Sequence, residues 1–352
     1  MSTLFTDACF NKKRSRTPVW MMRQAGRYLP EYRALKEHYD FLTMCKTPEL
    51  AAKVTLMPIK PVNPDAAILF SDILIVLPPM GININFNPGP VISNPVKNAS
   101  DIFALNNFSP RSELAFVSSA IKTARSQLSS NKALIGFCGA PLTIGAYLTK
   151  TDSKGQNFTE LRSLFYSDKR AAHRLMDTLV KIQSGFLIEQ IKAGVNGVQI
   201  FDTWAGSMPR DIIKEFVIPK VATIIKNVKE FIRNENNDKD VPVIYYIKDA
   251  VHVFDLLHLT GADVISIDEK VSIKYALTHI KGNMAIQGNL DSSILFASKE
   301  IITKEVSSIL STVPAGRGHI FNLGHGILPE TPVENAAFMI SEVKRLSKLL
   351  HD

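Results

Sequence analysis

The sequence predicts a single (β/α)8 barrel, with residues 1–352 forming one domain. Eight short apolar runs recur along the chain, and segments with helical periodicity lie between most of them. The runs are continuously apolar, which is typical of parallel strands that are buried on both faces. Eight strands alternating with helices in 352 residues match the arithmetic of this barrel. A doubly wound open sheet is the alternative, because periodicity by itself does not close a barrel.

The apolar runs give the predicted strands, and the periodic segments between them give the predicted helices. By residue number, the strands are 19–22, 66–70, 133–137, 197–201, 241–247, 263–267, 283–286 and 319–323. Helical periodicity predicts two helices over 161–193 and single helices over 209–232, 251–260, 272–280, 292–313 and 332–349. Pro332 suits the first turn of the last helix, where no backbone N–H is needed.

Two segments depart from the alternation of strands and helices. Residues 34–65 are predicted to be helical, with an end broken by prolines. Residues 78–110 are rich in Pro, Gly and Asn, and INFNPGPVI within them predicts a small hairpin around Asn87-Pro88-Gly89. At a barrel mouth this excursion would serve as a lid or as a subunit contact, and the sequence leaves both interpretations open.

Composition indicates a soluble globular protein. The chain is 45% hydrophobic and 21% charged, so it can bury a large core. Its three cysteines, Cys9, Cys45 and Cys138, form no CxxC pair, which favours a reducing compartment without disulfides. No apolar run has the length of a signal peptide or a membrane span. We therefore expect a cytoplasmic protein that does not associate with membranes.

The net charge of +8 favours an anionic partner. The basic residues are scattered, with no run of five or more and no interleaved aromatic residues of the kind found in single-strand binders. Nucleic acid is therefore disfavoured as a partner, and a small, heavily anionic substrate fits better.

The stretch PVWMMRQAGRYLPEYR, residues 18–33, is the strongest candidate for an anion site. Arg23 and Arg27 would share one face if the segment were a helical turn. Gly26 and Pro30 favour an irregular loop that leaves a strand end. Two guanidinium groups in such a loop suit a carboxylate or phosphate, which their planar forks pair bidentately. A solvated basic loop is the simpler alternative.

Polar residues follow strand after strand of the predicted barrel. Because the carboxyl ends of parallel strands meet at one face, where barrel active sites lie, these side chains are expected to converge. They are Arg23 and Gln24, Ser71 and Asp72, residues 138–141, Asp202 and Thr203, Lys248 and Asp249, Asp268, Gln287 and Asn289, and His325.

Six stretches occur in an order that resembles the uroporphyrinogen decarboxylase family over nearly the full chain. They are MRQAGRYLPEYR (22–33), FSDIL (70–74), GFCGAPLTIGAYL (136–148), FDTWAG (201–206), QGNLD (287–291) and NLGHGI (322–327). The resemblance implies a homodimeric, single-domain barrel of the haem pathway. Such an enzyme removes CO2 from the four acetate side chains of uroporphyrinogen III, an anionic tetrapyrrole, and gives coproporphyrinogen III. The family needs no cofactor and no metal for this reaction.

The resemblance assigns the central catalytic role to Asp72, the aspartate of FSD. Loss of CO2 leaves an electron pair that needs a sink, usually a cofactor. A pyrrole protonated on carbon is its own sink, so a carboxylate that accepts pyrrole N–H bonds and opposes the transient cation is sufficient. From the sequence by itself, a helix N-cap at Ser71-Asp72 is an equal interpretation.

The same resemblance places Arg27 and His325 at substrate carboxylates, with Arg23 and Gln24 nearby. Pairing an arginine with the leaving carboxylate would stabilise the ground state, so Arg27 is expected to hold side chains that stay. Arg23 is counted with the catalytic residues. A guanidinium with a pKa above about 12 is a poor general acid, so Arg23 is expected to position water or steer the intermediate.

Four further side chains complete the expected pocket. Tyr147 and Thr203 match family positions whose hydroxyls contact a substrate side chain, and Tyr147 is counted as catalytic as well. Without the resemblance, Tyr147 would be interpreted as a core residue. Phe70 and Phe201 are expected to form walls that exclude water, and ordinary core packing is equally consistent with them.

Three positions depart from the family pattern. Thr203 stands where serine is usual, Leu142 replaces an aromatic residue, and Glu269 replaces a common tryptophan. None of them is an arginine or aspartate of the expected site, so they bear on the shape of the pocket more than on the reaction.

Two other functions compete with decarboxylation. A corrinoid- or thiol-directed methyltransferase would share the barrel, but it needs a zinc site of His-x-Cys type to make a thiolate. No histidine lies two residues before any cysteine of this chain. A non-catalytic carrier of anionic tetrapyrroles or nucleic acid would bind with a steep dependence on salt and turn nothing over.

Overall fold

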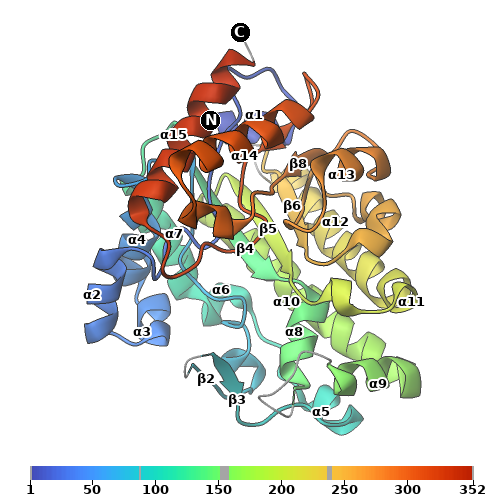
Figure 1. Ribbon diagram of the computed structural model, residues 1–352. Helices are drawn as coiled ribbons and strands as arrows, with labels where there is room; N and C mark the ends of the chain where they lie inside the picture. The colour runs from blue at the N-terminus through green and yellow to red at the C-terminus, as the bar shows by residue number, and fades with distance from the viewer. Residues whose placement is uncertain (1, 87–88, 151–157, 236–239, 351–352) are drawn as a thin grey trace.

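The computed structural model describes residues 2–86, 89–150, 158–235 and 240–350. Within these ranges, a seven-stranded parallel sheet runs through the centre of the molecule and helices surround it (Figure 1). Within this sheet, neighbouring strands follow one another in chain order. The strands are β1 (Ala66–Ile68), β4 (Ala133–Gly139), β5 (Gly197–Asp202), β6 (Val243–Ile247), β7 (Val264–Ser266), β8 (Ala285–Gln287) and β9 (His319–Ile320).

An eighth segment, near the N-terminus, closes the sheet into a barrel. On one side, Val19 forms a parallel bridge with Phe321, and the Trp20 N–H donates to the carbonyl of Phe321 at 3.2 Å. On the other side, the N–H of Asp65 donates to the carbonyl of Val19 at 2.8 Å. The segment therefore joins the last strand to the first, and the predicted (β/α)8 barrel is confirmed over the open sheet.

The predicted strand 19–22 is longer than the observed one. The backbone N–H groups of Met21 and Met22 donate to the side-chain oxygens of Gln24 and Asn322, at 3.0 and 2.9 Å. Side-chain acceptors thus replace the strand ladder after the first residues of the run. The run in the sequence is apolar because it is buried, and burial by itself does not set the length of a strand.

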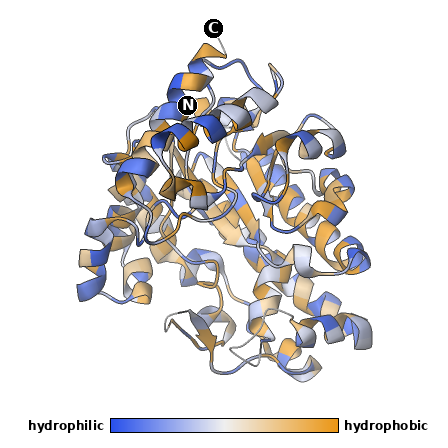
Figure 2. Ribbon diagram, in the orientation of Figure 1, coloured by the Kyte–Doolittle hydropathy of each residue, from blue (hydrophilic) through white to orange (hydrophobic). Residues whose placement is uncertain are grey.

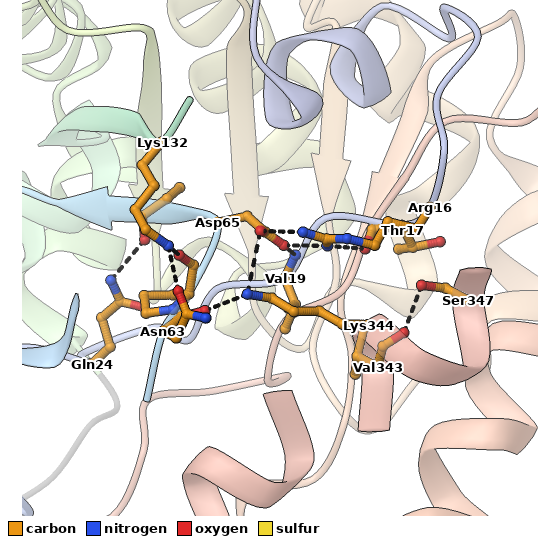
Figure 3. A network of polar contacts seen from close by, with 12 residues as sticks. Arg16, Thr17, Val19, Gln24, Asn63, Asp65, Lys132, Val343, Lys344 and Ser347 are labelled. Carbon is orange, nitrogen blue, oxygen red and sulfur yellow. Dashed lines mark hydrogen bonds and ion pairs between the residues drawn. The ribbon is translucent and has the colours of Figure 1, made fainter. Parts of the chain in front are cut away.

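Asp65 fixes the closing segment from below (Figure 3). Its carboxylate accepts both guanidinium nitrogens of Arg16 at 2.7 Å and the backbone N–H of Val19 at 2.9 Å. The ammonium of Lys344, on the C-terminal helix, lies 3.6 Å away. Burial opposes ionisation of Asp65, but the hydrogen bonds and charge of Arg16 outweigh it, with help from Lys344, and hold its pKa below the ordinary value.

The helices cover the outside of the barrel, and the apolar residues gather on the central strands (Figure 2). All seven residues of β4 and all five of β6 are buried, as expected of parallel strands covered on both faces. The α-helices are α1 (Leu4–Cys9), α2 (Pro30–His38), α3 (Phe41–Lys46), α4 (Pro48–Leu56), α5 (Ala99–Ala104), α6 (Pro110–Glu113), α7 (Ala115–Gln127), α8 (Pro141–Leu148), α9 (Thr159–Ser167), α10 (Lys169–Ala193), α11 (Arg210–Ile212), α12 (Ile218–Glu235), α13 (Ile273–His279), α14 (Lys299–Thr312) and α15 (Val333–Leu349). No helix in the described ranges is both long and apolar enough to span a membrane.

Most predicted helices are confirmed, and three differ in detail. The predicted helix 209–232 contains a π-helical turn, η4 (Ile213–Val217), just before Pro219, which has no N–H for the usual bond. The predicted helix 251–260 is the 3-10 helix η5 (Val251–Thr260). The predicted helix 292–313 is wrong as one unit, because the extended backbone at Ala297 and Ser298 separates η6 (Ser292–Phe296) from α14.

The segment 78–110 leaves the barrel as predicted. Its strands β2 (Ile84–Phe86) and β3 (Pro90–Ile92) pair in antiparallel fashion and confirm the hairpin. Asn87 and Pro88, where the turn was predicted, lie outside the described residues. The hairpin lies at the end of the barrel where α8 begins (Figure 1). After it, the N–H of Val96 donates to the carbonyl of Leu148 at 2.8 Å, which ties the excursion to the end of α8.

Replacing Asp65 by Asn should lower the free energy of unfolding by about 3 kcal/mol, because a largely buried guanidinium loses its partner. The deficit should be constant above about pH 5 and shrink below about pH 4, since a carboxylate with a depressed folded pKa loses its contribution as pH falls through that pKa. Urea denaturation measures both. Asp240→Asn is the matched control: it removes an exposed ion pair with Lys12 (3.3 Å) and should cost less than about 1 kcal/mol. Equal losses of unfolding free energy in the two variants would contradict the role of Asp65 in securing the closing segment.

Candidate active site

The predicted site residues follow different strands of the barrel. Arg23 comes after the closing segment, Asp72 after β1, Thr203 after β5 and His325 after β9. All of these strands are parallel, so the residues that follow them lie at one end of the barrel. The structure therefore places these four residues at the same end of the barrel.

Arg23 lies in a loop, as Gly26 and Pro30 predicted, and not in a helical turn. Its φ of 62° is left-handed, a conformation that reverses the chain directly after the closing segment. Its side chain crosses the loop that follows β9, because a Cβ at Gly326 would collide with Cδ of Arg23. The guanidinium thereby reaches the neighbourhood of His325.

His325 is a half-buried, neutral imidazole. Its Nδ1 accepts the N–H of Gly326 at 2.7 Å, so in the neutral ring the proton is on Nε2. Burial lowers the pKa of His325 to about 4, and the charges of Arg23 and Lys248 act in the same direction against the opposing charge of Asp249. At neutral pH this histidine is a hydrogen-bond donor without charge.

Asp72 is a half-buried carboxylate with one oxygen engaged. Its Oδ1 accepts the N–H of Leu74 at 2.8 Å. Residues 73–77 form turns and not a helix, so the helix N-cap interpretation from the sequence is wrong. Burial raises the pKa of Asp72 to about 6, although the Leu74 N–H and the charge of Arg23 both favour ionisation. Oδ2 makes no hydrogen bond within the described part of the chain, which leaves it available to a ligand.

Tyr147 extends the same site from α8. The side chain is half-buried, and its ring lies against that of Trp204, with centroids 6.3 Å apart. Burial raises the pKa of Tyr147, while the charge of Asp72 raises it further and that of Arg23 lowers it. Arg23, Asp72, Tyr147 and His325 thus share one electrostatic environment.

The remaining predicted residues lie around this group. Phe201 packs its ring against Phe137 and Tyr246, at 5.6 and 5.8 Å, and is half-buried. Phe70 is 7% exposed. Thr203, directly after β5, is half-buried and has no side-chain hydrogen bond among the described residues.

Arg27 and Gln24 behave differently from each other. Arg27 is exposed, and its guanidinium makes no hydrogen bond to another described residue. Gln24 is fully buried, with Oε1 accepting the N–H of Met21 at 3.0 Å and Nε2 donating to the carbonyl of Ala66 at 2.8 Å. The structure therefore uses Gln24 to hold the arginine loop onto β1 (Figure 3).

Two residues near the site received no role from the sequence. Lys248 follows β6, and its charge lowers the pKa of His325. Asp202, the last residue of β5, is fully buried and hydrogen-bonded to Thr143 on α8. Both stand in the register of polar strand ends, and that signal does not say which of them face the pocket and which brace it.

The described residues contain no group of three or more His, Cys, Asp or Glu side chains that could hold a metal ion. Cys9, Cys45 and Cys138 are buried and not in disulfides. Burial raises the pKa of each thiol, so none is a thiolate at neutral pH.

The fold and the site define a (β/α)8-barrel protein with arginines, a neutral histidine and a perturbed carboxylate at the carboxyl ends of its strands. A family model described as "Uroporphyrinogen decarboxylase (URO-D)" matches residues 2–346. Proteins named uroporphyrinogen decarboxylase include one from Geobacter sulfurreducens, 42% identical over 349 residues that cover 99% of this chain and 100% of that protein. Another, from Syntrophotalea carbinolica, is 41% identical over 98% of both chains. The chain belongs to the uroporphyrinogen decarboxylase family.

Solved structures support the fold. A methyltransferase from Methanosarcina mazei superimposes with a TM-score of 0.79 at 18% identity and covers 98% of this chain and 99% of its own. A B12-independent methionine synthase from Shewanella sp. W3-18-1 gives 0.55 at 12% identity, over 86% and 89% of the two chains. At these identities the likeness concerns the barrel and not the chemistry.

Replacing Arg23 by Met should raise the pKa values of both His325 and Asp72, because the arginine charge lowers each of them. NMR titration of the His325 ring, assigned with a His325→Gln variant, measures the first shift directly. Arg27→Met is the matched control, since it removes an exposed arginine of the same loop whose charge is not among those that act on His325. An unchanged His325 pKa in Arg23→Met would show that the guanidinium does not face the site.

Proposed function

We propose that this protein decarboxylates the four acetate side chains of uroporphyrinogen III to methyl groups and gives coproporphyrinogen III, without a cofactor. Full-length relatives carry the name of this activity. The observation that carries the proposal is Asp72, a carboxylate whose pKa is raised to about 6 and which shares its environment with Arg23. A reaction through a pyrrole-centred cation needs such a carboxylate, and Oδ2 of Asp72 is available to accept the pyrrole N–H groups.

The ionised form of Asp72 performs the central step. A pyrrole protonated on carbon accepts the electron pair that CO2 leaves behind, and the transient charge on the ring is positive. The carboxylate accepts pyrrole N–H bonds and opposes that charge, and these interactions strengthen when the bound tetrapyrrole displaces water from the site. With a pKa of about 6, most of Asp72 is ionised at pH 7.

Arginine and neutral donors hold the substrate by its other carboxylates. Arg27 is exposed and belongs to the loop that carries Arg23, so it can pair with carboxylates that stay on the ring. His325 donates through Nε2 without adding a charge. An arginine on the departing carboxylate would stabilise the ground state as that charge disappears, so the uncharged donor is better suited to the reacting side chain.

Arg23 supports the reaction through its charge. A guanidinium is a poor proton donor at neutral pH, but beside Asp72 it favours the ionised carboxylate. It would also position the water or side chain that delivers protons. Tyr147 and Thr203 supply hydroxyls to a substrate side chain, and Phe70 and Phe201 form apolar walls.

We further propose that the 352 residues act as one domain in a cytoplasmic homodimer. The family resemblance supports the dimer, and the unpaired, buried cysteines support a reducing compartment. The hairpin of β2 and β3, at the same end of the barrel as α8, is suited to a lid or to a subunit contact.

Anaerobic incubation of the chelator-treated protein with uroporphyrinogen III should give products with seven, six, five and then four carboxylates, resolved after oxidation by chromatography.

The wild-type kcat/KM should rise as pH increases through about 6, because Asp72 ionises there. Asp72→Asn keeps the shape and removes the charge, so kcat should fall about 10²–10³-fold. Tight binding without release of CO2 would indicate a carrier, and wild-type rates in Asp72→Asn would refute the mechanism.

Arg27→Ala should raise KM for uroporphyrinogen about tenfold and change kcat little, because it removes an anchor that is equally strong in ground and transition states. Steady-state kinetics at two salt concentrations measures the effect. Arg33→Ala does not serve as a control, since its guanidinium supports the loop by donating to the carbonyls of Arg27 and Tyr28. Lys36→Ala, on the exposed surface of α2, is suitable. Unchanged KM and kcat in Arg27→Ala would reject the anchoring role.

A further inference from the structure

A buried carboxylate beneath the site connects the helix that carries Tyr147 to the barrel. Asp202, the last residue of β5, is 0% exposed. Its Oδ1 accepts the hydroxyl of Thr143 at 2.6 Å, and its Oδ2 accepts the hydroxyl of Tyr245 at 2.9 Å. Hydrogen bonds to an ionised acceptor inside a protein are short and strong, and the distance to Thr143 has that character.

The hydroxyl of Thr143 is used twice. It donates its single hydrogen to Asp202 and accepts the backbone N–H of Trp204 at 3.2 Å. Because the donated hydrogen is fixed by the carboxylate, the lone pairs of the oxygen are directed to the N–H of Trp204. One side chain on α8 thereby holds both the end of β5 and the loop that follows it.

This connection sets the position of two residues of the proposed pocket. Thr143 and Tyr147 are four residues apart on α8, so they lie on the same face of the helix, and the ring of Tyr147 meets that of Trp204. Thr203 lies between the two braced residues, Asp202 and Trp204. A shift of α8 relative to β5 would displace the hydroxyls of Tyr147 and Thr203 together.

We propose that Asp202 and Thr143 are positioning residues, which hold the hydroxyls of Tyr147 and Thr203 at the substrate. The inference rests on the proposed function, since those hydroxyls matter only if they contact the tetrapyrrole. Both positioning residues are 0% exposed, so neither side chain is open to a molecule that approaches from solvent. Displacements of about 1 Å in a substrate-contacting group can cost about a hundredfold in rate. The hydrogen bonds of Asp202 and Thr143 therefore have kinetic consequences.

The first test compares variants that remove different bonds to Asp202. Thr143→Val keeps the shape and removes the hydroxyl, and kcat/KM should fall about tenfold or more. Thr143→Ser restores the hydroxyl and should recover activity to within about threefold of wild type. Tyr245→Phe is the matched control, because it removes the other bond to the same carboxylate without touching α8, and its kcat/KM should stay within about threefold of wild type. Equal losses in Thr143→Val and Tyr245→Phe would overturn the proposal.

A double-mutant cycle with Tyr147→Phe separates positioning from a general loss of stability. If Thr143 acts through the hydroxyl of Tyr147, the effect of Thr143→Val should be at least about threefold smaller in the Tyr147→Phe background than in the wild type. If the fold-losses in kcat/KM of Thr143→Val and Tyr147→Phe simply multiply in the double variant, the two residues act independently and the inference is overturned. Circular dichroism and thermal unfolding establish that each variant is folded at the assay temperature.

A second variant keeps the test decisive if Thr143→Val does not fold. Asp202→Asn retains an oxygen that can accept from Thr143 and presents an amide NH2 to Tyr245. It therefore weakens the hydrogen bonds between α8 and β5 without removing them. It should lower kcat/KM relative to wild type, and Tyr147→Phe should again reduce its effect. If the wild-type protein releases no CO2, the proposed function is refuted. If the wild type is active but the losses of the single variants simply multiply in the double variants, only the positioning role of Asp202 and Thr143 is refuted.

Discussion

Closure of the barrel depends on one short segment near the N-terminus, which hydrogen-bonds to β9 on one side and to the start of β1 on the other. Asp65 secures it by accepting both the Val19 N–H and the Arg16 guanidinium. Without this segment the sheet would have two open edges, and β1 and β9 would not be neighbours around the ring. The chain reverses directly afterwards at Arg23, so the contact that completes the fold also delivers the first arginine of the site.

The site results from that neighbourhood. The closing segment stands between β9 and β1, which places Arg23 between His325 and Asp72. Its charge lowers the pKa of both, while burial raises that of the carboxylate to about 6 and lowers that of the histidine to about 4. As a result, an ionised carboxylate and a neutral hydrogen-bond donor coexist near Arg23 at neutral pH. On the opposite flank, Asp202 and Thr143 connect α8 to β5.

Sequence patterns predicted the order of elements well and their lengths less well. The two-helix interpretation of 161–193 and the hairpin between residues 84 and 92 are confirmed. The strand 19–22 and the helix 292–313 were wrong in length, because side-chain hydrogen bonds from Gln24 and Asn322 and the extended backbone at Ser298 override hydrophobic periodicity. The bond between Met22 and Asn322 joins residues 300 positions apart and leaves no local trace in the sequence.

The sequence by itself indicated the alternation of strands and helices, the family and which residue types stand at the ends of the strands, since each depends on local runs and motifs such as RQAGR and FSD. Tertiary structure alone decided whether the sheet closes, which of these polar residues are fully buried and which are open to a ligand. Gln24 and Asp202 are as polar as Arg23 and Asp72, yet both are fully buried and engaged with neighbouring elements. Burial and partner geometry set the pKa and availability of a side chain, and both depend on segments that are distant in the chain.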